Sequence, residues 1–231
     1  MTRPVVFVHG IRTSSAIWSS QVAALTEHGH HSVTVDLPGH GARTADRFTL
    51  DGAFQAIDDA VVGCAVPPLL VGLSLGGYAS LAYAARNEDK LAGVMLAGCS
   101  TEIRGKPLGA YRRLAQHMNE VVRSDDGTWH VVTDMLAAMK GYSSMADLRR
   151  LRVPVWLVNG KRDLLRLDER RFLGAKPGTR LSVVPRAGHD VNSHAPIVFN
   201  RILLDALHEL RLPELHLPEL HLPQLLAPHP A

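Results

Sequence analysis

Short, continuously apolar runs alternate along this chain with longer amphipathic segments, and this alternation limits the possible folds more than any other feature of the sequence. Most of these runs are rich in Val, Ile and Leu and are bounded by Gly, Pro or polar residues, which is typical of buried strands. Strands that alternate with helices indicate a mostly parallel sheet flanked by helices, the α/β class. We predict strands at 5–8, 32–37, 69–73, 91–97, 153–158 and 181–184, and helices at 17–28, 50–64, 75–86 and 196–210.

Residues 99–152 interrupt the alternation, because they contain helical patterns at 108–122 and 129–139 and no clear strand. We expect most of this segment, about 101–146, to form a short helical cap over the carboxyl edge of the sheet, where α/β folds bind ligands. Residues 1–211 would then form one domain with this cap inserted.

The last twenty residues, 212–231, form a Leu-, Pro- and His-rich tail in which Leu-Pro-Glu-Leu-His repeats. A proline every five residues is incompatible with a regular α-helix. The histidines of this tail have no Cys or carboxylate partners in a ligand pattern, so we predict no metal site there.

Composition narrows the class of protein further. The chain has 231 residues, 46% of them hydrophobic and 20% charged, with a formal net charge of +3, which is typical of a folded globular protein. No basic run carries interleaved aromatic residues, and no apolar run approaches the ~18 residues of a membrane span, so we expect neither nucleic-acid binding nor a transmembrane helix. No signal peptide fits the N-terminus. Cys64 and Cys99 lie in apolar surroundings, so we expect buried thiols and a reducing, cytoplasmic location.

One sequence motif contains a candidate catalytic nucleophile. Residues 72–77 read Gly-Leu-Ser-Leu-Gly-Gly between a predicted strand and a predicted helix, which is the context of a Gly-x-Ser-x-Gly nucleophile elbow. Such a turn exposes Ser74 on a strained backbone, and its flanking glycines allow close approach of neighbouring chain. The N-terminus of the following helix would direct N–H groups at a developing oxyanion.

A serine hydroxyl needs a base, and the base needs an orienting acid. Asp163 follows the predicted strand 153–158, and His189 follows the predicted strand 181–184. Both residues should therefore lie on the same sheet edge as Ser74, in the chain order serine, acid, histidine that this motif requires. We predict that His189 accepts the proton of Ser74 and that Asp163 fixes the imidazole tautomer.

Two other carboxylates compete with Asp163 for this role. Asp190 adjoins the histidine in sequence, and such neighbours rarely orient each other's rings. Asp168 lies further into the next segment, and the loop at 98–101, another position for the acid, holds no carboxylate.

The segment His9-Gly10-Ile11 follows the first strand and completes the predicted site. We assign the two oxyanion donors to the backbone N–H groups of Ile11 and Leu75, with Arg12 as the alternative to Ile11. His9 itself is expected to support the loop by hydrogen bonding rather than to take part in the chemistry.

The sequence resembles the α/β-hydrolase superfamily, in its compact branch of serine esterases and lipases. The resemblance runs from about residue 4 to 210. It includes the His-Gly after the first strand, Asp-Leu-Pro-Gly-His-Gly at 36–41, the elbow at Ser74, and the segments ending at Asp163 and His189. It implies hydrolysis through an acyl-enzyme, without a metal or organic cofactor. Dehalogenases and epoxide hydrolases of this fold differ in having an aspartate at the elbow.

The predicted substrate is a small or medium carboxylic ester or lactone, bound in an apolar pocket. The same site would also serve a thioesterase, an acyl transferase, a C–C hydrolase or a lyase, and a non-catalytic receptor is a further alternative. For such substrates, Lys106, Arg112, Arg113 or Lys140 of the insertion could hold a carboxylate. The candidate pocket residues, each of which could equally be a packing residue, are Trp18, Tyr78, Met118, Trp129, Met135 and Met139.

Overall fold

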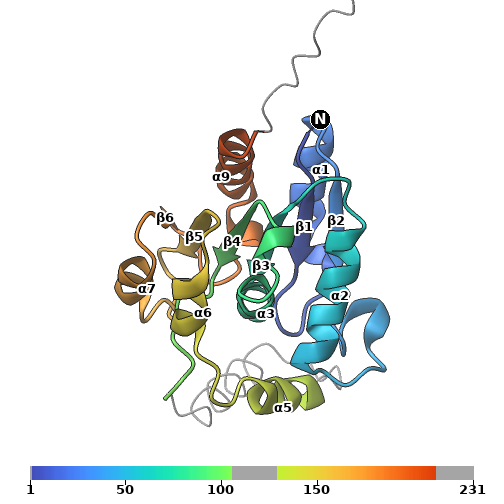
Figure 1. Ribbon diagram of the computed structural model, residues 1–231, viewed down its shortest axis with the longest axis vertical. Coiled ribbons are helices and arrows are strands. Elements are labelled where there is room, and N and C mark those ends of the chain that lie inside the picture. Colours follow the sequence, from blue (N-terminus) through green and yellow to red (C-terminus); the bar gives the residue numbers. More distant parts are fainter. Residues whose placement is uncertain (1, 106–128, 212–231) are drawn as a thin grey trace, which may run out of the picture.

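The computed structural model describes residues 2–105 and 129–211, and its centre is a six-stranded sheet with the order β2-β1-β3-β4-β5-β6 (Figure 1). Every neighbouring pair of strands is parallel. The predicted α/β class with a parallel sheet is therefore confirmed. The strands are β1 (Val5–Val8), β2 (Ser32–Val35), β3 (Leu69–Leu73), β4 (Gly93–Ala97), β5 (Val155–Gly160) and β6 (Arg180–Val184).

The predicted helices are present with adjusted ends. The segment predicted at 17–28 begins with a 3₁₀ turn, η1 (Ser15–Trp18), before α1 (Ser19–Glu27). Three short helices were not predicted: α6 (Ser144–Arg150), α7 (Glu169–Ala175) and α8 (Val191–His194). The helix predicted at 108–122 lies outside the described residues. The other helices are α2 (Leu50–Val62), α3 (Leu75–Ala84), α5 (Trp129–Ala138) and α9 (Pro196–Glu209), with further 3₁₀ turns η2 (Gly41–Arg43) and η3 (Glu88–Lys90).

The strands bury side chains on both faces of the sheet. In β1, Val6 and Val8 join one hydrophobic cluster, whereas Val5 and Phe7 join another, because successive side chains of a strand point to opposite faces. The first cluster includes side chains of α2, α3, α6 and α7, and the second includes those of α1, α8 and α9. Figure 1 shows α1 and α9 above the sheet and α2, α3 and α6 below it.

The strand order changes direction beside β1, which lies between β2 and β3. In open α/β sheets, ligands bind outside the carboxyl ends of the strands at such a switch point. The loop after β1 and the turn after β3 are therefore adjacent at the position where the fold places a ligand.

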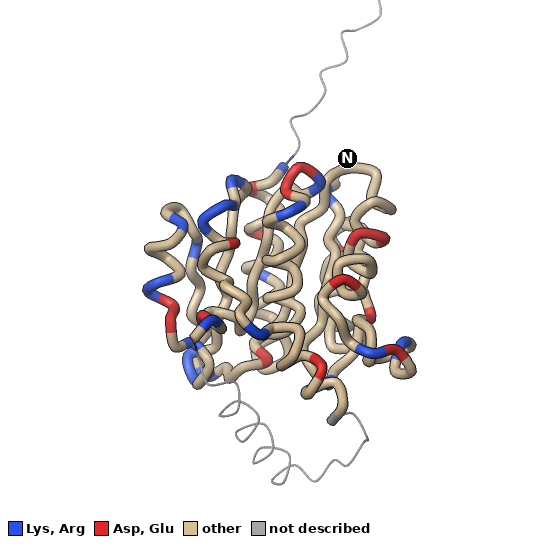
Figure 2. Tube along the Cα trace, turned by 60° about the horizontal axis from the view of Figure 1, so that its bottom comes forward, with Lys and Arg blue, Asp and Glu red and all other residues tan. Residues whose placement is uncertain are grey.

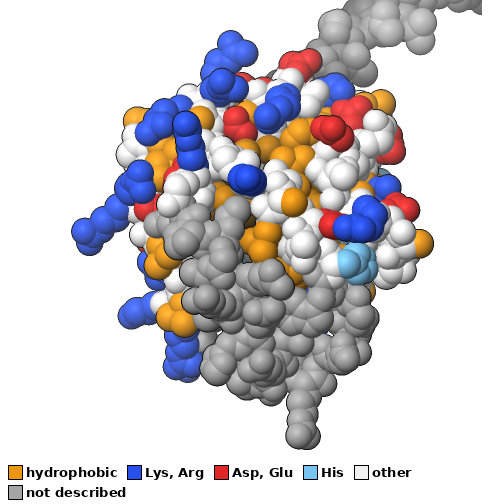
Figure 3. Space-filling model, turned by 90° about the horizontal axis from the view of Figure 1, so that it is seen from below, with side chains coloured by type: hydrophobic (Ala, Val, Ile, Leu, Met, Phe, Trp, Pro, Cys, Tyr) orange, Lys and Arg blue, Asp and Glu red, His pale blue; other side chains and the backbone are white. Residues whose placement is uncertain are grey.

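Charged residues of both signs are distributed over the segments around the sheet (Figure 2). On the face seen in Figure 3, Lys and Arg gather along the left flank, the side on which α6 and α7 lie in Figure 1. Several cations of these segments pair with acids three residues away: Arg150 with Asp147, Arg166 with Glu169, and Arg171 with Asp168. Within residues 2–105 and 129–211, no helix is long and apolar enough to cross a membrane.

Candidate active site

Ser74 connects β3 to α3, and its backbone has a conformation that residues other than glycine rarely adopt. Its φ and ψ angles are 52° and −115°, a strain of about 1–3 kcal/mol that persists only where the surroundings enforce it. The Ser74 N–H donates to the Ala97 carbonyl at 2.8 Å, and the Tyr78 N–H donates to the Ser74 carbonyl at 3.0 Å. The turn thus holds the serine at the start of α3, on the carboxyl edge of the sheet.

The glycines around Ser74 are required by close backbone packing. A Cβ on Gly72 would lie 2.4 Å from the Gly76 carbonyl oxygen, and a Cβ on Gly76 would lie 2.4 Å from the carbonyl oxygens of Val8 and His9. Larger residues would force β3, α3 and β1 apart. The Gly-x-Ser-x-Gly pattern therefore has a steric explanation in this fold.

The structure brings the three predicted catalytic side chains together. His189 Nε2 lies 2.8 Å from Ser74 Oγ, and His189 Nδ1 lies 3.0 Å from Asp163 Oδ2. The other carboxylate oxygen of Asp163 accepts the Leu165 N–H at 2.8 Å. The Asp163 side chain is only 1% exposed, whereas that of His189 is 28% exposed. The arrangement can transfer the serine proton to the imidazole and stabilise the resulting imidazolium.

His189 and Asp163 each shift the pKa of the other toward its charged form. Burial favours the neutral imidazole of His189, but the hydrogen bond to Asp163 and the negative charges of Asp163 and Asp190 outweigh it and raise its pKa. Burial also opposes the charged form of Asp163, yet its hydrogen bonds with His189 and Leu165 lower the pKa of the carboxyl. At neutral pH, Asp163 is consequently an anion that is placed to stabilise a proton on His189.

The competing carboxylates have other positions. Asp168 accepts the Glu102 N–H at 3.0 Å with one oxygen and pairs with Arg171 through the other. Asp190 precedes α8, and its effect on His189 is electrostatic. Neither forms the hydrogen bond to His189 that Asp163 forms.

The loop after β1 runs beside the elbow, because a Cβ on Gly10 would lie 3.6 Å from Ser74 Cβ. Within the described residues, the Ile11 N–H makes no backbone hydrogen bond. Leu75 opens α3, and the first N–H groups of a helix have no acceptor inside that helix. Arg12, the alternative donor, has a positive φ of 56°. The assignment of Ile11 and Leu75 as oxyanion donors stays a prediction.

His9 has the supporting position expected of it. It is fully buried, its Nε2 accepts the Leu37 N–H at 3.1 Å, and its Nδ1 lies 2.7 Å from the Gly10 carbonyl oxygen. These contacts require a neutral ring that carries its proton on Nδ1. Burial lowers the pKa of His9 to about 4, against the raising effect of the Gly10 contact, so the ring stays neutral at ordinary pH.

The described side chains that were predicted to contact substrate pack in the core instead. Trp18 is fully buried and stacks on Phe7 at 4.7 Å between ring centroids, so it is a core side chain and we do not assign it a substrate contact. Met139 is 1% exposed and Met135 packs beside it on the same cluster, in agreement with the packing alternative. Met118, Lys106, Arg112, Arg113 and the side chain of Trp129 lie outside the described residues.

Tyr78 is also mostly buried, and its hydroxyl donates to the Thr101 carbonyl at 2.9 Å and accepts the Thr101 N–H at 3.2 Å. This pair of contacts was not predicted. They join α3, one turn beyond Ser74, to the segment that follows β4. Tyr78 is therefore a structural link between two elements of the site.

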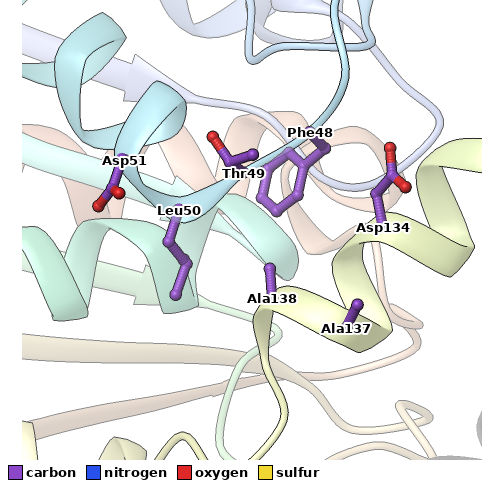
Figure 4. Close-up of a pocket in the computed structure, with 7 residues that line it drawn as sticks. All are labelled: Phe48, Thr49, Leu50, Asp51, Asp134, Ala137 and Ala138. Atoms are coloured by element: carbon purple, nitrogen blue, oxygen red, sulfur yellow. The ribbon is translucent and has the colours of Figure 1, made fainter.

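A pocket of about 280 Å³ lies between the start of α2 and α5 (Figure 4). Asp51 and Asp134 lie at opposite sides of the view, with Phe48, Leu50 and the α5 alanines between them. Asp134 is already paired with Arg47, and none of the triad residues lines this pocket. The pocket is distinct from the Ser74 site. The lining residues are Phe48, Thr49, Leu50, Asp51, Asp134, Ala137 and Ala138.

Comparisons with known proteins agree with this geometry. The chain is 28% identical over 194 residues to pimeloyl-[acyl-carrier protein] methyl ester esterase of Neisseria meningitidis, covering 67% of this chain and 74% of that protein. It is 26% identical over 242 residues to a putative carbamate hydrolase, RutD, of Agrobacterium fabrum, covering 88% and 92% respectively. These relatives are named as hydrolases that act on different bonds.

Solved structures share the fold. A thermophilic esterase from Thermogutta terrifontis superimposes with a TM-score of 0.74 at 20% identity, covering 91% of each chain. The alpha/beta hydrolase family model matches residues 5–202, which include the elbow, the acid and the histidine. The chain is a member of the alpha/beta hydrolase family.

Proposed function

We propose that this protein is a serine hydrolase that cleaves a small or medium carboxylic ester or lactone through Ser74, His189 and Asp163. The observation that carries the proposal is the continuous hydrogen-bonded chain from Ser74 Oγ to His189, at 2.8 Å, and from His189 to Asp163, at 3.0 Å. It stands at the N-terminus of α3, where helix N–H groups favour a negative charge.

In the first half of the reaction, His189 Nε2 removes the hydroxyl proton as Ser74 Oγ attacks the acyl carbon. The carbonyl oxygen becomes an oxyanion, for which the N–H groups of Ile11 and Leu75 are the proposed donors. The imidazolium, stabilised by Asp163, then returns the proton to the leaving alcohol, and an acyl-serine remains.

In the second half, water takes the place of the alcohol and loses a proton to His189 as it attacks the acyl-serine. Collapse of the second oxyanion releases the carboxylic acid and restores Ser74. The strained backbone at Ser74 keeps its Oγ in place through both halves. We further propose a reducing cytoplasmic setting, which suits the two free thiols; Cys99 is buried as expected, whereas Cys64 is only partly buried.

The names of the relatives favour hydrolysis, and that of the Neisseria protein favours an ester. The name of the Agrobacterium protein points instead to a carbamate. A carbamate would be attacked by the same serine, so the bond type is an outcome of the experiment rather than a different mechanism.

The test is a panel of p-nitrophenyl esters, lactones and carbamates offered to wild type and to Ser74→Ala. We expect turnover of at least one ester or lactone by wild type and its loss in the variant. A fluorophosphonate probe should label wild type and fail to label Ser74→Ala. Ser80→Ala is the matched control, because Ser80 lies on the same helix, is fully buried and its hydroxyl has no hydrogen-bond partner among the described residues.

Each alternative has its own signature in this panel. Turnover that survives Ser74→Ala would overturn the acyl-enzyme mechanism. Labelling by the fluorophosphonate without turnover of any panel member would favour thioester, acyl-transfer or C–C chemistry. Tight binding of a small molecule with neither labelling nor turnover would favour a receptor.

A further inference from the structure

We propose that Glu102 is a positioning residue that ties the two ends of the 99–152 insertion together and, through Thr101, fixes the loop that carries Asp163. Glu102 follows β4, where the insertion begins, and it is 6% exposed. A buried carboxylate is costly unless hydrogen bonds satisfy its oxygens. The donors that satisfy Glu102 come from two segments far apart in sequence.

The carboxylate joins both ends of the insertion. Oε1 accepts the N–H of Arg104 at 3.0 Å, close to where the insertion leaves the sheet. Oε2 accepts the N–H of Met145 at 2.8 Å, at the start of α6, and the hydroxyls of Ser143 and Ser144 lie 3.4 and 3.5 Å from it. A single side chain thus closes a chain segment of about forty residues.

The neighbouring residue extends this link to the catalytic acid. Thr101 is fully buried, and its hydroxyl donates to the Leu165 carbonyl and accepts the Leu167 N–H at 3.3 Å. The N–H of the same Leu165 donates to Asp163 Oδ1 at 2.8 Å. The loop that holds the carboxylate of Asp163 therefore rests on Thr101.

Two further hydrogen bonds lock Thr101 and Glu102 in place. The Glu102 N–H donates to Asp168 Oδ2 at 3.0 Å, and the Asp168 N–H donates to the Ser100 carbonyl at 3.0 Å. In addition, the Tyr78 hydroxyl of α3 forms hydrogen bonds with the carbonyl and the N–H of Thr101. The segment 100–102 therefore contacts the elbow helix, the end of the insertion and the acid loop at once.

The consequence rests on the proposed function. When the carboxylate of Glu102 is removed, residues 143–145 lose their anchor, the segment 100–102 shifts, and the Leu165 N–H is no longer held against Asp163. Asp163 then stabilises the His189 imidazolium less well. Turnover should fall, and the acid limb of kcat/KM, which reports the pKa of His189, should move to lower pH.

The test uses Glu102→Gln and Glu102→Ala, with p-nitrophenyl acetate as substrate and hydrogen exchange followed by mass spectrometry as a second measurement. We expect kcat to fall roughly tenfold in Glu102→Ala, by loss of alignment, with KM little changed, and to recover partly in Glu102→Gln, which keeps one acceptor. The acid limb should move to lower pH, and amide exchange should rise in residues 163–168 as well as in 143–145.

Glu88→Gln is the matched control. The Glu88 carboxylate also accepts backbone N–H groups where the insertion ends, those of Arg152 and Val153, but at the amino end of β5. This variant should lose stability without moving the acid limb. If Glu102→Ala fails to fold, Thr101→Val removes the hydroxyl contacts to the acid loop alone and should give the same shift.

Exchange confined to residues 143–145, with the wild-type acid limb in both Glu102→Gln and Thr101→Val, would overturn the inference and leave Glu102 as a purely structural anchor. The exchange measurement does not depend on ester turnover. If wild type hydrolyses nothing in the panel, the proposed function fails, but hydrogen exchange still shows whether Glu102 is coupled to residues 163–168.

Discussion

Gly160→Ala should disable the site without touching any of its catalytic side chains. Gly160 ends β5, three residues before Asp163, and its Cα faces the loop that carries His189. A Cβ added there would lie 2.1 Å from the Gly188 carbonyl oxygen and 2.5 Å from that of Ala187. Both partners are backbone atoms, so no side chain can rotate away.

The required movement sets the magnitude of the effect. A Cβ essentially never lies within 3.0 Å of a neighbouring heavy atom, so the loops that carry Asp163 and His189 must separate by at least about 1 Å. The 3.0 Å hydrogen bond between them would lengthen beyond the usual range. A misplacement of this size costs about 100-fold in rate, and the overpacking itself costs about 1–3 kcal/mol of stability.

The assay compares kcat/KM for p-nitrophenyl acetate with the urea midpoint of each variant. Gly174→Ala is the control, because Gly174 lies in α7 with no atom within 4 Å of an added Cβ and without a positive φ. It should keep full activity and gain up to about 1 kcal/mol, the helix preference of Ala over Gly. A Gly160→Ala enzyme that folds and turns over within twofold of wild type would refute this reasoning.

Three further predictions concern single side chains. Because the pKa of His189 is raised, kcat/KM should fall as the pH drops through a value above the ordinary 6.5. Asp163→Asn should move this fall to lower pH. An unchanged pH–rate profile in the variant would contradict the pairing of His189 with Asp163. Because the pKa of His189 is higher in the folded than in the unfolded chain, its protonation also stabilises the fold. This contribution to folding stability is complete below the ordinary pKa and is lost as the pH rises through the raised value. Trp18→Ala should cost about 3–5 kcal/mol in urea denaturation and leave KM unchanged, whereas a raised KM would restore it as a substrate contact. His9→Asn should lower kcat roughly 10- to 100-fold by loosening the loop of Ile11, a proposed oxyanion donor, without moving the acid limb, because the pKa of His9 is about 4.

The positions of Ser74, Asp163 and His189 were predictable because their loops follow short runs of residues whose composition is typical of strands. Parallel strands end on one edge of a sheet, so three residues separated by up to 115 positions in the chain could be expected together from the strand patterns, the Gly-x-Ser-x-Gly motif and the chain order serine, acid, histidine. In the segment 17–28, the spacing of Trp18 and Leu25 by seven residues predicts that both lie on one buried helix face, and both are fully buried in one cluster. This spacing did not indicate that the ring of Trp18 is enclosed by Phe7 and Phe199.

The short helices α6, α7 and α8 were not predictable, because they have four to seven residues and depend on tertiary contacts. Helices this short are marginal on their own. The first N–H groups of α6 are satisfied by the Ser143 hydroxyl and by Glu102, and the second of these is more than forty residues away. Glu102 itself had no signal in the sequence, since a single glutamate in a polar segment is usually solvated.

Which residues form the site follows from strand ends, but the distances between these residues depend on close contacts between backbones. Gly72 and Gly76 allow β1, β3 and α3 to approach each other, and Gly160 allows the acid loop to meet Gly188. In each case the glycine makes room for a backbone oxygen, and in the last the partner is 28 positions further along the chain. Sequence patterns can therefore identify which residues meet, because they follow strand ends. The hydrogen-bond lengths on which proton transfer depends are set by these close backbone contacts, which become visible only when both loops are in place.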